Sequence, residues 1–200
     1  MMRVPGRSKR CLVLVVVLGS LPVVAQSKLP PTLAALVPAG AQVTSQSFAK
    51  APTLAAADFA AEKKLPANHT AYFNFHISAQ DAASPLWKMR EPIYRQEMAD
   101  KVAAKRNSFK AGTVTPITYD PLNETSYGWG RGITQRVVHH YVGAGTGPDY
   151  VDYHAVYYGV TNGIIFELSV EGVINLDEAD QWAKNVAAKL SNLNVSSLNH

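Results

Sequence analysis

The chain has 200 residues, with 19 lysines and arginines against 15 aspartates and glutamates, so its formal net charge is +4 at pH 7. Its single cysteine, Cys11, excludes an internal disulfide and any zinc site built from several cysteines. The length suits one globular domain with a sizeable core.

The first 25 residues have the three regions of a secretory signal peptide. The basic segment MMRVPGRSKR precedes the apolar run CLVLVVVL, which is too short to span a bilayer, and GSLPVVA supplies small residues ahead of a cleavage site. Cys11 begins the apolar run and does not stand at a cleavage point, so it is not a lipid-anchor cysteine. We expect cleavage after Ala25 and export of residues 26–200, as one soluble domain, to the periplasm or the exterior of a bacterium.

Removing this segment changes the charge. Arg3, Arg7, Lys9 and Arg10 all lie in it, which leaves 15 basic against 15 acidic residues and no cysteine. A neutral mature chain gives no reason to expect nucleic-acid binding. No later apolar stretch approaches the length of a membrane span, so we expect no stable membrane insertion after cleavage.

The first part of the mature chain predicts a short helix and then strands. Pro31 suits the first position of a helix that Pro38 and Gly40 must end, and residues 41–50 alternate as a strand does. The alanines of residues 53–64 favour a helix, whereas the turn formers of residues 65–70 and the strand pattern of 71–78 suit a hairpin. We predict a strand for 53–64 and keep the helix as the alternative.

Between residues 81 and 110 the apolar period becomes helical. Pro85 and Pro92 suit first-turn positions, which predicts a short turn over 86–90 and a main helix over 92–109. The apolar stripe of that helix comprises Ile93, Tyr94, Met98, Val102 and Phe109.

Residues 113–173 return to strand composition, with turn formers between the runs, and predict an antiparallel meander. A last helix follows Asn175, which has capping-box spacing to Glu178. The sequence therefore predicts an α+β fold with an antiparallel sheet of about five to six strands and two amphipathic helices packed on one of its faces. This order of elements resembles the PsbP-like arrangement, a resemblance of architecture that implies no function.

Asn162 and Gly163 give the strongest local signal, because this dipeptide between two strand-like runs favours a two-residue hairpin turn. That turn fixes the cross-strand pairs. It places Ala155, Tyr157, Phe166 and Leu168 on an apolar face toward the helices.

The opposite face of this hairpin is the candidate binding surface. The predicted pairing joins Tyr158 to Glu167 and His154 to Glu171, and Asp152 follows the same alternation. The preceding strand adds Arg136 and His140 if its register turns Val137 and His139 toward the core, and a slip of one residue reverses that assignment. A solvated sheet face explains these residues without a site, but aromatic rings beside charges are typical of binding surfaces. The candidate residues are therefore His154, Tyr158, Glu167, Glu171, Asp152, Arg136 and His140.

Enzyme motifs give little support for catalysis. The chain has no Gly-x-Ser-x-Gly, His-Glu-x-x-His or phosphate-binding glycine motif. We therefore expect a non-catalytic binding or accessory protein of the cell envelope, without metal or other cofactor, whose partner is a protein or a small molecule. The alternative is a hydrolase or metal-assisted enzyme that uses the polar face around His154, Glu167 and Glu171.

Overall fold

The structure is a computed structural model that describes residues 29–51, 54–66, 69–109, 112–114, 116–120, 122–140, 149–173, 175–194 and 198. The predicted signal peptide and its cleavage site lie outside these residues. Within them, no helix combines the length and the apolar character that a membrane crossing requires.

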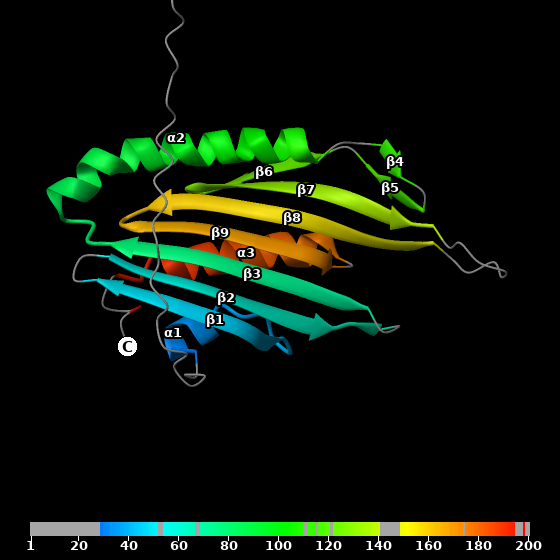
Figure 1. The fold of residues 1–200 in the computed structure, drawn as a ribbon, viewed down its shortest axis with the longest axis horizontal. Coiled ribbons are helices and arrows are strands. Elements are labelled where there is room, and N and C mark those ends of the chain that lie inside the picture. The colour runs from blue at the N-terminus through cyan, green and yellow to red at the C-terminus, as the bar shows by residue number, and fades with distance from the viewer. Residues whose placement is uncertain are drawn as a thin grey trace, which may run out of the picture.

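The N-terminal half forms a short helix, three long strands and a long helix (Figure 1). Residues 54–64 form a strand, because Ala55, Ala57 and Phe59 are buried while Asp58 between them is exposed. The helical alternative for this segment is therefore wrong. The elements are α1 Pro31–Ala34, β1 Gln42–Ala51, β2 Leu54–Lys64, β3 Thr70–Gln80 and α2 Pro85–Ser108.

The C-terminal half is a meander closed by a helix. Asn162 and Gly163 both have positive φ, at 43° and 83°, as the predicted two-residue turn requires. The predicted register between the two strands of this hairpin is confirmed from Thr161 and Ile164 as far as Ala155 and Val170. The elements are β4 Gly112–Val114, β5 Ile117–Tyr119, β6 Asn123–Tyr127, β7 Gly130–His139, β8 Tyr150–Thr161, β9 Ile164–Val173 and α3 Leu176–Leu190.

The described strands form one antiparallel sheet in the order β1-β2-β3-β9-β8-β7-β5-β4, with β6 also paired to β7. The α+β class with a large antiparallel sheet is confirmed. The sheet has nine strands where the sequence predicted about five to six. Part of the difference comes from turns inside predicted strands: Pro116 separates β4 from β5, and Gly128, with φ +48°, separates β6 from β7.

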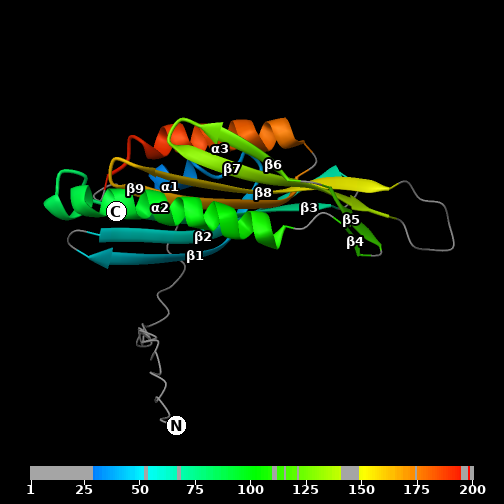
Figure 2. The same cartoon turned by 90° about the horizontal axis from the view of Figure 1, so that it is seen from above.

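The two long helices lie on opposite faces of the sheet, so the prediction that both pack on one face is wrong (Figures 1 and 2). On one face, Ala183 and Leu190 of α3 share a core with Tyr157 and Phe166. On the other, Val102 of α2 packs against Val156 and Tyr158. Residues of β8 therefore alternate between two apolar environments.

Helix α2 is continuous, and the predicted break before Pro92 is wrong. Ser84 caps it, because its hydroxyl accepts a hydrogen bond from the Trp87 backbone nitrogen at 3.1 Å. The rings of Trp87 and Tyr94, which flank Pro92 in the sequence, are stacked with their centroids 5.8 Å apart. Val102 lies on the buried stripe as predicted, whereas Ile93 is 54% exposed.

Candidate functional site

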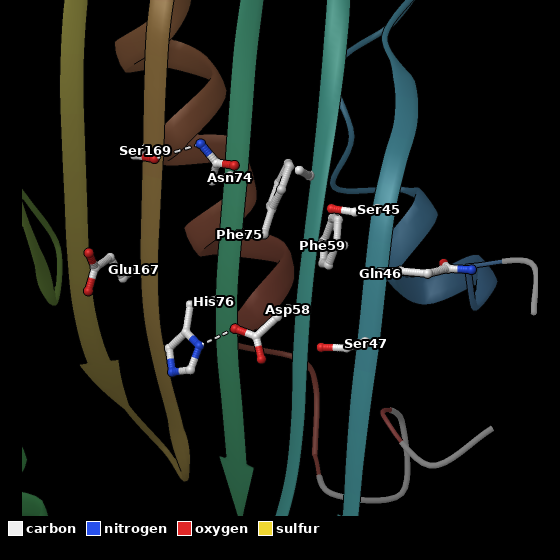
Figure 3. A pocket seen from close by; sticks show the side chains of 11 residues that line it. Ser45, Gln46, Ser47, Asp58, Phe59, Asn74, Phe75, His76, Glu167 and Ser169 are labelled. Atoms are coloured by element: carbon white, nitrogen blue, oxygen red, sulfur yellow. Dashed lines mark hydrogen bonds and ion pairs between the residues drawn. The ribbon is translucent and has the colours of Figure 1, made fainter. Parts of the chain in front are cut away.

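Helix α2 covers only part of the sheet face on which it packs. It lies over β7 and β8, while polar side chains of β1, β2 and β3 on the same face remain uncovered. A hollow of about 380 Å³ lies over these strands and β9 (Figure 3). We name this hollow the sheet groove and define it by Ser45, Ser47, Asp58, Asn74, His76, Glu167 and Ser169.

Strand alternation explains why polar side chains gather in the sheet groove. In β3, Phe73, Phe75 and Ile77 are buried on the α3 side of the sheet, which leaves Asn74 and His76 on the α2 side. Neighbouring antiparallel strands then place register partners beside one another on the same face. The groove is therefore a consequence of period-two patterning in four strands.

One row of the sheet groove crosses four strands in register: Ser47, Asp58, His76 and Glu167. Asp58 Oδ1 and His76 Nδ1 are hydrogen-bonded, and both side chains are about half exposed. Lys101 of α2 reaches the end of the row, with its Nζ 2.8 Å from Glu167 Oε2. Each carboxylate in the row therefore has a partner: Lys101 forms an ion pair with Glu167, and the His76 imidazole is hydrogen-bonded to Asp58.

A second row lies beside the first and is neutral. Ser45, Ala60, Asn74 and Ser169 are successive register partners. The Asn74 side-chain amide donates to Ser169 Oγ at 3.2 Å. Together the two rows offer carboxylate acceptors, an amide and several hydroxyls on one open surface.

The order of residues in the first row does not suit nucleophilic catalysis. Serine activation requires an imidazole that contacts the hydroxyl and is oriented by a third group. Here Asp58 lies between Ser47 and His76, so the imidazole is on the far side of the carboxylate. The geometry supports hydrogen bonding to a ligand and not proton transfer from Ser47.

The structure separates the residues of the predicted surface. Glu167 lines the sheet groove. Tyr158 is its register partner but is buried beneath α2, at 5% exposure, and burial together with nearby Glu167 raises the pKa of Tyr158 to about 12. The partly buried Trp129 packs edge-to-face on Phe166 of the core beneath α3, with ring centroids 4.9 Å apart.

A β-bulge breaks the predicted pair of His154 and Glu171. The register of β8 and β9 is regular up to Ala155 and Val170 and resumes at Tyr153 and Val173, so two residues of β9 stand opposite one of β8. Gly172 permits the bulge with φ +77°, and a Cβ at this position would lie 2.6 Å from the Thr70 carbonyl oxygen. Glu171 is exposed and pairs with Tyr72 of β3.

His154 belongs instead to a cluster around the buried Asp152, beyond the end of β9. His139 Nε2 lies 3.2 Å from Asp152 Oδ2, and His154 Nε2 lies 3.8 Å from Oδ1. The ring of Tyr150 stacks on His69, with centroids 3.6 Å apart. Burial raises the pKa of Asp152, and the two imidazoles of His139 and His154 oppose that shift. We name these five residues the Asp152 cluster.

Arg136 and His140 do not join the candidate surface, because the register of β7 is the one-residue slip that reverses their assignment. Val137 pairs with Asp152 and His139 with Tyr150, whereas Arg136 pairs with Tyr153 on the opposite face. Arg136 binds Asp120, at 2.5 Å between Nη1 and Oδ2. His140 contacts two partners, with Nδ1 3.0 Å from Asp149 Oδ2 and Nε2 2.8 Å from Thr118 Oγ1.

The sequence reasoning missed Ser47, Asp58, Asn74 and His76. The signal that could have found them is the hairpin of β2 and β3, in which Lys64 pairs with Thr70 and every earlier pair follows, including Asp58 with His76. The hydrolase or metal-assisted alternative needs His154, Glu167 and Glu171 together, and the structure places them in three different surroundings. Among the residues that the structure describes, no group of three His, Cys, Asp or Glu side chains is arranged to hold a metal ion.

Comparisons with known proteins leave the family open. No protein-family model matches the chain, and no curated protein matches it. Among solved structures, the chain is similar to the crystal structure of the extracellular domain of PknH from Mycobacterium tuberculosis, with 11% identity and a TM-score of 0.44 over 88% of this chain and 93% of that chain. At this identity and TM-score the similarity carries no argument about function.

Proposed function

We propose that the protein is an exported, non-catalytic binding protein of the bacterial cell envelope that holds a small, neutral, hydroxyl-rich molecule in the sheet groove. The observation that carries the proposal is the uncovered pair of polar rows on a face that α2 covers only over β7 and β8. Concave sites with convergent polar groups are the usual places where small ligands bind.

The side chains of the groove suit hydroxyl groups. A hydroxyl both donates and accepts hydrogen bonds, and the groove offers acceptors on Asp58 and Glu167 and both functions on Asn74. The ion pair with Lys101 offsets the charge of Glu167, and Asp58 already shares a hydrogen bond with His76, so neither carboxylate is left without a partner to attract a cationic ligand. Tyr72, which is 50% exposed, precedes Asn74 on the same face of β3 and offers an aromatic ring for the apolar side of a sugar ring.

A panel of neutral saccharides tests this proposal on the mature chain. We expect glucose, N-acetylglucosamine, trehalose or maltotriose to raise the melting temperature saturably. A ligand at ten times its dissociation constant adds about 1.4 kcal/mol to the free energy of unfolding. For a chain of this size that is a shift of roughly 3–5 °C. Asp58→Asn and Asn74→Ala should reduce the shift, whereas Asp100→Asn, an exposed carboxylate change on α2, should leave it intact. An equal response of the Asp58→Asn variant and the wild type would contradict the proposal.

A docking role for α2 is the second candidate, and one observation favours it. Leu86, Met89 and Ile93 are 44%, 65% and 54% exposed, and their spacing places them on one side of the first turns of the helix. Exposed apolar side chains that lie together mark protein contacts. Crosslinking in the native envelope should capture a specific protein with the wild type and lose it with Met89→Glu. Equal capture by both would reject this role.

A further inference from the structure

A second hollow lies on the opposite face of the sheet, beside the first half of α3. Its volume is about 490 Å³, within the range typical of small-molecule sites. Its walls come from α3, from the ends of β2, β3 and β9, and from the turn before β1. We name it the α3 pocket and define it by Lys63, Leu65, Ala71, Phe73, Val173, Asp177, Glu178 and Trp182.

The inner part of the α3 pocket is apolar and rigidly held. The Trp182 indole nitrogen donates to the Leu36 carbonyl oxygen at 3.0 Å, which fixes the orientation of the ring. Phe73 meets that ring edge-to-face with centroids 5.3 Å apart, and Phe75 does so at 5.6 Å. Because these rings are already packed against one another, an apolar ligand gains contacts without first ordering the site.

The charged side chains of the pocket favour a cation. Asp177 and Glu178 are exposed in the first turn of α3, and neither carboxylate has an ion-pair partner among the described residues. The helix end beside them does not attract an anion strongly, because the Asn175 side chain already accepts hydrogen bonds from the Asp177 and Glu178 backbone nitrogens. Lys63 is the one cation among the residues that line the pocket, so the two carboxylates outnumber it.

We propose that the α3 pocket binds a small apolar molecule that carries one cationic group, with its apolar part against Phe73 and Trp182 and its cation near Asp177 and Glu178. This site is independent of the sheet groove, which opens on the other face of the sheet. A ligand in either site can therefore be detected without occupancy of the other.

Three probes with the same eight-carbon chain separate the contribution of the charged group from that of the apolar chain. They are octylamine, octanol and octanoate, each used below its micelle concentration. The readout is the indole N–H signal of Trp182 in a nitrogen–proton NMR spectrum, identified by its loss in Trp182→Phe; the sequence has three tryptophans. We expect octylammonium to shift this signal saturably and to bind about fivefold more tightly than octanol, since an exposed ion pair contributes up to about that factor. Octanoate should bind more weakly than either.

Matched variants test the role of the carboxylates. The double change Asp177→Asn with Glu178→Gln should remove the advantage of octylammonium over octanol, whereas Glu97→Gln with Asp100→Asn on α2 should keep it. The proposal is overturned if no probe shifts the Trp182 signal, or if octanoate binds as tightly as octylammonium. It is also overturned if the double variant keeps the full preference for the cation.

Discussion

Replacing Asp152 by asparagine should stabilise the protein at alkaline pH and leave its stability unchanged at strongly acidic pH. Asp152 is 6% exposed, and its Oδ1 atom is buried without a hydrogen-bond partner. Its other oxygen has one contact, with His139 Nε2 at 3.2 Å. Asparagine keeps the shape of the side chain and removes the charge that burial disfavours.

The direction in which Asp152 changes stability with pH follows from the direction of its pKa shift. Burial raises the pKa of Asp152 in the folded state, so the folded protein retains this proton at pH values where the unfolded chain has released it. The stability that Asp152 contributes is therefore fully present below the ordinary aspartate pKa and is lost as the pH rises through the raised one. A charge buried with few hydrogen bonds costs free energy that the neutral asparagine side chain does not. We expect a gain of only about 1 kcal/mol for Asp152→Asn, because the hydrogen bond between His139 Nε2 and Oδ2 already offsets part of that cost in the wild type.

Thermal melts of the wild type and of Asp152→Asn across the range from acidic to alkaline pH measure this difference. A gain of about 1 kcal/mol corresponds to about 2–4 °C for a chain of this size. Asp149→Asn is the matched control, because Asp149 also faces a histidine, His140, but its side chain is 51% exposed. The control should change the melting temperature little. A lower melting temperature for Asp152→Asn at alkaline pH would refute the reasoning.

Two further changes test the backbone of the candidate site and the cap of α3. Gly172→Ala should destabilise the protein by roughly 2 kcal/mol or more in urea unfolding, because alanine is strained at φ +77° and its Cβ meets the Thr70 carbonyl oxygen; a loss below about 0.5 kcal/mol would show that the bulge is absent. Asn175→Ala should cost about 1 kcal/mol, because it removes the acceptor of two backbone N–H groups of α3, whereas the exposed Asn185→Ala should cost less. Equal losses for these two asparagines would contradict the assigned cap.

The hairpin of β8 and β9 shows how far sequence reasoning reaches and where it ends. The turn residues Asn162 and Gly163 define the register correctly as far as Ala155 and Val170. Beyond that point the pairing is shifted by a bulge at Gly172, which pattern-based pairing does not include. A glycine inside a strand is a sign of such a bulge.

The placement of α2 could not be read from its own apolar stripe. The run Ala155–Val160 is buried without interruption, and such a run indicates a strand covered on both faces. Each amphipathic helix needs an apolar surface to pack on, but both faces of this strand are apolar and either could receive it. The sequence therefore predicts that helices cover the sheet without assigning a face to each.

The residues of the sheet groove could not be predicted from the sequence for a related reason. Asp58 and His76 come from two strands that the sequence analysis expected to form a hairpin without defining its register, so their contact could not be predicted without the length of the turn between Lys64 and Thr70. The burial of Asp152 was equally hidden, because a carboxylate in an alternating strand is normally read as solvent-facing. Only the assembled sheet shows which polar residues remain open.

The most direct test of the proposed binding function is an NMR titration of residues 26–200 with the saccharide that raises their melting temperature most. Our account predicts that the Asn74 side-chain amide and the His76 imidazole signals shift together and saturably, while the Trp182 indole signal on the opposite face stays in place. Saturable shifts confined to other parts of the molecule, or unchanged Asn74 and His76 signals, would contradict the assignment of the sheet groove as the ligand site.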